Sequence, residues 1–159
     1  MRKLVLVGAL MAATAAPALA QEAEPFTLAG NIALATDYTF RGISQTNENP
    51  AVQGGFDAAF GSFYAGTWAS NVAFGGSLEL DLYAGFKPQL GPVALDLGVI
   101  AYLYPGSADD AAEFDYIEPY VKASISPAEG VTLGGALFYS PEFFGETGAA
   151  YYLEGNAGF

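Results

Sequence analysis

The sequence has 159 residues, of which 17 are acidic, five are basic and none is histidine or cysteine. Its net charge of −12 argues against a nucleic-acid partner, because such partners are bound through lysine and arginine contacts to phosphates. The lack of histidine and cysteine excludes Ser-His-Asp triads, histidine metal sites, disulfides and thiolate chemistry. The sequence also has no visible nucleophile motif and no EF-hand-like spacing of acids. We therefore predict that the protein is not an enzyme and has no catalytic residues, cofactor or metal site.

The first twenty residues have the pattern of a secretory signal peptide. Arg2 and Lys3 precede an apolar run from Leu4 to Ala16, and the small residues of Ala18-Leu19-Ala20 suit a cleavage site. The run is too short to be a transmembrane helix. We predict a signal peptide over residues 1–20 and one domain over residues 21–159.

Eight later segments alternate apolar and polar side chains with a period of two, as half-buried strands do. In chain order they are residues 28–40, 51–60, 63–72, 77–87, 93–104, 114–125, 131–140 and 149–159. The clearest is the fourth, in which Leu78, Leu80 and Leu82 alternate with Glu79 and Asp81. The pattern predicts an all-β protein with an antiparallel sheet.

Two segments make specific structural predictions. The first is expected to run unbroken to Phe40, with Tyr38 on its apolar side, and the third is expected to place Tyr64 and Trp68 on its apolar side. Pro119 lies inside the sixth segment, where proline cannot donate a ladder hydrogen bond. We therefore expect a bulge or a local break there.

Charged side chains gather on the polar sides of these segments. They are Asp37, Arg41, Asp57, Glu79, Asp81, Lys87, Asp96, Glu118, Lys122 and Glu154. A charge that faces hydrocarbon is costly, whereas one that faces a wet lumen is not. We therefore predict an antiparallel transmembrane β-barrel of eight strands, whole or a truncated part of a larger barrel, with these ten residues facing its lumen. Asp37 and Arg41 are interpreted as an ion pair or as part of a constriction.

The connections between segments alternate in length. Short turns at residues 61–62, 88–92 and 127–130 alternate with longer connections at 41–50, 105–113 and 141–148. Barrels of the bacterial outer membrane have short periplasmic turns and long extracellular loops. The predicted location is therefore the bacterial outer membrane, and the predicted partners are its lipid and small solutes or ions.

Three functions remain compatible with the alternation. A porin-like barrel would pass small solutes or ions, with weak cation selectivity because seven acids face three bases in the predicted lumen. A non-channel outer-membrane barrel would have an interior packed with side chains, and would serve a structural or surface-interaction role. A soluble lipocalin-like periplasmic binding protein would turn its apolar side chains inward. The sequence favours the porin-like barrel and leaves the solute and the oligomeric state open.

The sequence also resembles a known family. The stretch NIALATDYTFRGISQT at residues 31–46, followed by AVQGGFD at 51–57, is similar to the opening of the TorF-type porin family. The stretches YAGTWASNV at 64–72 and YLYPG at 102–106 continue the resemblance. It implies a bacterial outer-membrane β-barrel and a pore, and it supplies no substrate or catalytic residue. Members of that family continue with further strands, so the resemblance implies a truncated member.

Overall fold

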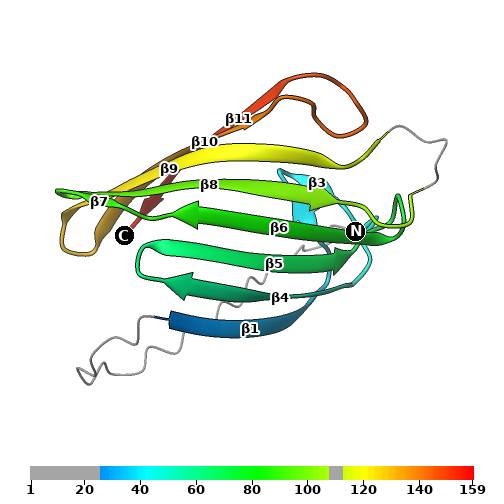
Figure 1. The fold of residues 1–159 in the computed structure, drawn as a ribbon, viewed down its shortest axis with the longest axis horizontal. Coiled ribbons are helices and arrows are strands. Elements are labelled where there is room, and N and C mark those ends of the chain that lie inside the picture. Colours follow the sequence, from blue (N-terminus) through cyan, green and yellow to red (C-terminus); the bar gives the residue numbers. More distant parts are fainter. Residues whose placement is uncertain (1–25, 108–112) are drawn as a thin grey trace, which may run out of the picture.

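The computed structural model describes residues 26–107 and 113–159, so the predicted signal peptide lies outside the described residues. Within these ranges the chain forms β-strands and no helix (Figure 1). The strands are β1 (Phe26–Ala35), β2 (Thr39–Phe40), β3 (Ile43–Ser44), β4 (Ala51–Phe60), β5 (Phe63–Asn71), β6 (Leu78–Phe86), β7 (Gln89–Leu90), β8 (Val93–Leu103), β9 (Tyr116–Ala128), β10 (Val131–Ser140) and β11 (Ala150–Gly158). The predicted all-β class with an antiparallel sheet is confirmed. None of the described segments is a helix long and apolar enough to cross a membrane.

Eight long strands form one sheet in the order β1-β4-β5-β6-β8-β9-β10-β11. Every neighbouring pair is antiparallel, because each strand follows its neighbour through a turn or loop at the end of the sheet. The short strand β7 pairs with the start of β8, and β2 and β3 form a separate hairpin. The sheet therefore has two edges, β1 and β11.

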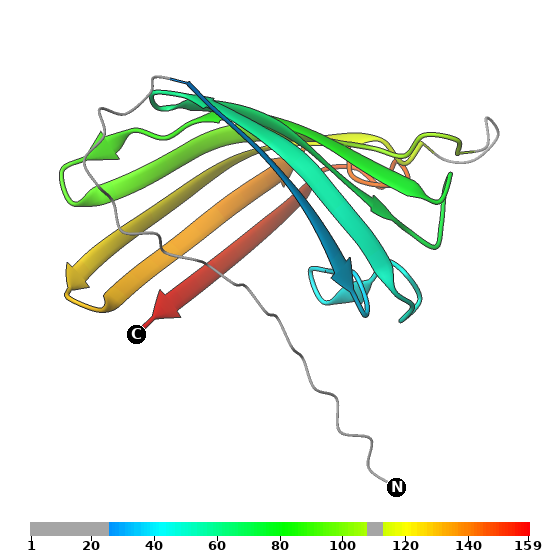
Figure 2. The same cartoon turned by 90° about the horizontal axis from the view of Figure 1, so that it is seen from below.

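The predicted closed barrel is not found. Within the described residues, β1 pairs only with β4 and β11 only with β10, and the sheet forms an open arch (Figure 2). The chain segment between β1 and β4 folds back under this arch, where it occupies space inside the curve. Eight strands closed on themselves leave room for little more than their own side chains. The segment between β1 and β4 therefore takes up part of the small interior that an eight-stranded closure would leave.

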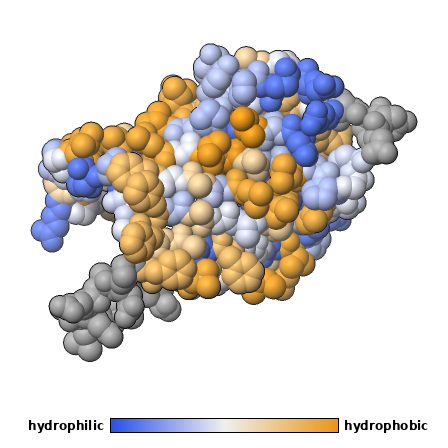
Figure 3. Space-filling model, viewed as in Figure 1, coloured by the Kyte–Doolittle hydropathy of each residue, from blue (hydrophilic) through white to orange (hydrophobic). Residues whose placement is uncertain are grey.

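The two faces of the arch differ sharply in chemistry. The convex outer face carries exposed apolar side chains on every long strand, among them Ile32 and Leu34, which are 80% and 84% exposed (Figure 3). The concave inner face buries polar side chains instead, and Glu79 and Glu118 are only 2% and 1% exposed. This is the reverse of a soluble fold, in which apolar side chains fill the interior and charges face water.

Two predictions about individual strands are wrong. The first strand ends at Ala35, so Tyr38 and Phe40 belong to the segment under the arch and not to an apolar outer face. In β5, Trp68 lies opposite Asp81 on the inner face, and Thr67 lies opposite Leu82 on the outer face. Hydropathy misled here because aromatic rings, rather than short polar side chains, line much of the inner face.

Pro119 does not interrupt β9, which continues to pair with β8 through the Val99–Pro119 position. On its other side the ladder to β10 ends at the pair Phe138–Tyr120, and Tyr120 directly follows the proline in the chain. The hydroxyl of Ser140 then donates to the carbonyl of Ile117 at 3.1 Å. The expected break therefore affects only one ladder, and the irregular register between β9 and β10 lies at Val131–Leu133 instead.

Three tyrosines on the inner face lie against glycines directly across from them. The pairs are Tyr83 on Gly66, Tyr64 on Gly85 and Tyr120 on Gly98. A Cβ atom added at Gly98 would come within 2.5 Å of the Tyr120 ring. Because the Tyr120 hydroxyl is hydrogen-bonded to that of Tyr64, the ring has little freedom to move away. The glycines thus provide the space in which the rings lie flat on the sheet.

We predict that Gly98→Ala lowers the free energy of unfolding by about 1–3 kcal/mol, the usual cost of overpacking. Gly155→Ala is the matched control, because the nearest atom to its added Cβ is 3.9 Å away. Urea unfolding followed by the fluorescence of Trp68, the single tryptophan, measures both variants. Equal stability of the two variants would contradict the assigned ring packing.

Candidate functional site

The segment between β1 and β4, residues 36–50, is called the inner hairpin here because it lies under the arch (Figure 2). Its two strands pair Thr39 with Ser44 and Phe40 with Ile43. Arg41 and Gly42 form the turn, with φ angles of 47° and 85°. Two-residue turns with positive φ match the twist of a hairpin, and glycine adopts them without strain. The turn directs the Arg41 side chain toward the sheet.

Asp37 fixes the base of the inner hairpin. Its carboxylate accepts hydrogen bonds from Ser44 at 2.6 Å, from Thr46 at 2.7 Å and from Thr39 at 3.3 Å. The hydroxyls of Ser44 and Thr46 hold the pKa of this carboxyl below its ordinary value, because they stabilise the charged form. Asp37 therefore organises its own loop and does not pair with Arg41.

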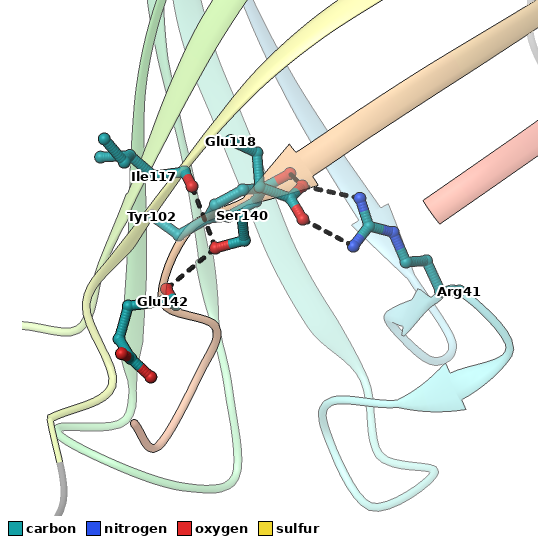
Figure 4. A network of polar contacts seen from close by, with 6 residues as sticks. All are labelled: Arg41, Tyr102, Ile117, Glu118, Ser140 and Glu142. Carbon is teal, nitrogen blue, oxygen red and sulfur yellow. Dashed lines mark hydrogen bonds and ion pairs between the residues drawn. The ribbon is translucent and has the colours of Figure 1, made fainter. Parts of the chain in front are cut away.

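Arg41 instead pairs with Glu118 of β9 (Figure 4). Nη1 and Nη2 donate to the two carboxylate oxygens at 2.9 and 2.6 Å, in the bidentate geometry that suits a guanidinium. The hydroxyl of Tyr102 donates a further, longer hydrogen bond to Glu118 at 3.3 Å. The guanidinium also lies over the rings of Tyr152 and Phe40, at 4.2 and 4.6 Å from their centroids. A pair so enclosed joins the inner hairpin firmly to the sheet.

A second contact joins the hairpin to the sheet through Glu79 of β6. Tyr38 donates to one of its oxygens at 2.6 Å and Tyr104 donates to the other at 2.8 Å. The Tyr38 ring packs edge-on against Trp68 of β5, with centroids 5.2 Å apart. Glu79 and Glu118, the two most deeply buried acids of the inner face, thus both accept hydrogen bonds from side chains that include one of the inner hairpin.

Aromatic rings seal this end of the arch, where the longer connections lie. The buried core here consists of Val72, Tyr102, Tyr104 and Tyr116. Phenylalanines from three separate loops pack against it, namely Phe74, Phe114, Phe143 and Phe144. Tyr104 and Phe114 thus meet Phe74 and the phenylalanines of residues 141–149 in one cluster. Among the described residues, aromatic rings fill the interior at this end of the arch.

At the opposite end, near the short turns, the inner face is open. Lys87, Asp96, Lys122 and Glu154 line a cavity of about 410 Å³ there. The hydroxyl of Tyr64 donates to Asp96 at 2.5 Å, and the hydroxyl of Tyr83 donates to Asp57 at 2.5 Å. Nine of the ten charged residues singled out in the sequence therefore separate into a sealed group and an open group, whereas Asp37 is bound within the inner hairpin.

The sealed group comprises Arg41, Glu79 and Glu118, with Asp81 beside them. One carboxylate oxygen of Asp81 is buried without a hydrogen-bond partner in the described part of the chain. The open group comprises Asp57, Lys87, Asp96, Lys122 and Glu154. The sequence analysis identified the charged residues, but it did not predict the tyrosines whose hydroxyls donate hydrogen bonds to the carboxylates. The recurring tyrosines on the polar sides of strands were the available signal.

We predict that Arg41→Gln lowers the free energy of unfolding by about 3–5 kcal/mol, because it leaves Glu118 buried without a cation. The double variant Arg41→Gln with Glu118→Gln should lose clearly less than the sum of the two single losses. Lys87→Gln is the control, because the ion pair of Arg41 with Glu118 is the only one among the described residues. Urea midpoints read from Trp68 fluorescence measure the coupling. Additive losses would mean that the two side chains do not interact.

Comparison with known proteins gives one finding. A family model described as "Bacterial protein of unknown function (Gcw_chp)" matches residues 19–159. No curated protein and no solved structure matches the chain. The match supplies no function, and the similarity to TorF-type porins stays a prediction. Because the family model covers nearly the whole sequence, the chain belongs to the Gcw_chp family of bacterial proteins.

Proposed function

We propose that this chain forms a porin-like β-barrel of the bacterial outer membrane that lets small solutes or ions pass, and that it is not an enzyme. One observation carries the proposal: exposed apolar side chains cover the outer face of the arch, while the charged side chains of the strands lie on the inner face. A transmembrane barrel needs this division, because its outer side contacts lipid and its inner side contacts water or polar groups.

The dimensions of the strands support the same proposal. The eight long strands of the main sheet have 9 to 13 residues each. A tilted strand needs about 9–11 residues to cross the hydrocarbon layer. Residues 61–62 and 129–130 make short turns at one rim, whereas the connections from Ala35 to Ala51, from Leu103 to Tyr116 and from Ser140 to Ala150 are longer and join strand ends at the other. Outer-membrane barrels have this asymmetry between their two rims.

The proposal requires partners for the edges β1 and β11. No backbone group can remain unpaired in hydrocarbon, because there is no water to replace the missing hydrogen bond. The two edges run antiparallel to each other, and Leu28, Ile32 and Leu153 lie on the same outer face. Direct pairing of β1 with β11 would give a packed barrel, whereas additional strands between them would widen the lumen.

A non-channel barrel is the second candidate, and the sealed end of the arch favours it. There the inner hairpin and rings such as Tyr102, Tyr116 and Phe144 fill the interior. The lipocalin-like alternative finds no such support, because its apolar side chains would have to face inward. Conductance separates the two membrane candidates.

Lysine substitutions at two adjacent residues of β1 test the membrane assignment. Ile32 lies on the outer face, Ala33 lies on the inner face, and both are exposed. We predict that Ile32→Lys impairs membrane assembly and that Ala33→Lys does not. A lysine facing lipid costs roughly 2–4 kcal/mol at the midplane and less near the interface. Heat-modifiable gel mobility of the membrane fraction measures assembly. Equal assembly of both variants would remove the support for a lipid-facing outer face.

Conductance in a planar bilayer tests the pore itself. We predict ion conductance with weak cation selectivity, because the inner face carries more carboxylates than basic groups and negative surfaces concentrate cations. The selectivity should fade as salt rises, since the Debye length falls from about 10 Å at 0.1 M to about 3 Å at 1 M. Reversal potentials in a salt gradient provide the measurement. An anion-selective current would contradict the lumen assignment, and a folded protein without conductance would favour the non-channel barrel.

A further inference from the structure

The open end of the inner face has a hollow whose shape follows from the sequence. Across β8, β9, β10 and β11, one row of neighbouring residues consists of Ala94, Ser124, Gly134 and Asn156. Three of these four side chains are small, so this row forms a low floor. The next row consists of Asp96, Lys122, Ala136 and Glu154, which rise at its side. The result is the cavity of about 410 Å³, with Lys87 at its margin.

The four charged groups around this cavity do not pair with one another. Asp96 accepts its hydrogen bond from the Tyr64 hydroxyl at 2.5 Å. The ammonium of Lys87 lies over the ring of Tyr64, 4.3 Å from the centroid. The ammonium of Lys122 lies over the ring of Tyr120 at 4.6 Å. No ion pair between them occurs within residues 26–107 and 113–159.

Tyrosine rings keep the charges in this arrangement. An ammonium over an aromatic face is held by the ring quadrupole and still keeps donors free for another acceptor. The hydroxyls of Tyr64 and Tyr120 are hydrogen-bonded to each other, so both rings are fixed. The ammonium groups of Lys87 and Lys122 and the carboxylates of Asp96 and Glu154 therefore line one cavity, and they can still form hydrogen bonds with a ligand.

We propose that this cavity binds a small zwitterionic solute of the amino-acid or short-peptide class. The solute's carboxylate contacts Lys122 or Lys87, and its ammonium contacts Glu154 or Asp96. A purely anionic solute would meet two carboxylates in the same cavity, and a purely cationic one would meet two ammonium groups. Only a ligand that carries both charges finds opposite charges for each of its ends, in the two lysines and in the two carboxylates. Passage of the bound solute through the barrel rests on the proposed function. Binding of the solute to the cavity does not require conductance.

Binding to the full chain, folded in detergent micelles, tests the proposal by titration calorimetry with three probes of similar size. They are glycylglycine, which is zwitterionic, N-acetylglycine, which is anionic, and glycylglycinamide, which is cationic. Glycylglycine is expected to bind at least about tenfold more tightly than either of the others, because a charge-assisted hydrogen bond to each end contributes. Equal binding of N-acetylglycine, or no binding of glycylglycine to folded protein, overturns the proposal.

Charge variants locate the site. Lys122→Glu should weaken glycylglycine binding about tenfold or more, because three carboxylates would then face the ligand. Exchanging the charges in the double variant Lys122→Glu with Glu154→Lys should restore binding, since the ligand can turn round. Asp57→Asn is the control, because Asp57 lies on the inner face outside the cavity. Failure of the exchange to restore binding, in protein whose Trp68 fluorescence shows a native fold, also overturns the proposal.

Conductance and glycylglycine binding test the pore and the zwitterion site separately. Conductance without glycylglycine binding would leave the porin-like function intact and overturn the zwitterion site. Glycylglycine binding without conductance would support the site and favour the non-channel barrel as its carrier.

Discussion

The structure depends most on the carboxylate of Glu118, which is buried on the inner face and neutralised by Arg41. Removing two charged groups from water costs free energy of desolvation. Only a close ion pair with further hydrogen bonds offsets this free energy. The bidentate contact and the Tyr102 hydroxyl supply both. Because Arg41 comes from the inner hairpin, the pair also fixes that hairpin under the arch. The hairpin cannot leave without exposing an unpaired charge to a ring-lined interior.

Tyrosine gives the inner face its particular character. Its ring supplies apolar area and its hydroxyl supplies a hydrogen bond, so one residue type both packs the interior and satisfies carboxylates. Tyr38 and Tyr104 do this for Glu79, and Tyr64 does it for Asp96. Glycines opposite the rings let them lie flat on the sheet. The charges of the inner face are thus held by tyrosines more often than by opposite charges.

This arrangement makes the two ends of the arch unequal. At the end with long connections, the inner hairpin and the phenylalanines of the loops fill the interior. At the end with short turns, small residues such as Ser124 and Gly134 leave a cavity among charged groups. A solute entering from the short-turn rim would therefore meet the cavity first and the inner hairpin second. In the proposed porin-like barrel, the inner hairpin is the element that limits passage.

The sequence by itself determined the strands and most of their faces, because a period of two in hydropathy is a local property of extended chain. It placed Glu79, Asp81, Asp96, Glu118, Lys122 and Glu154 on polar sides, and the register puts them together on the inner face. Only the tertiary structure decided that Arg41 pairs with Glu118, 77 positions away, and that β1 ends at Ala35. It also decided the side of Trp68 and the open state of the sheet. These features depend on which distant side chains meet inside the curve, and no local pattern of hydropathy records that.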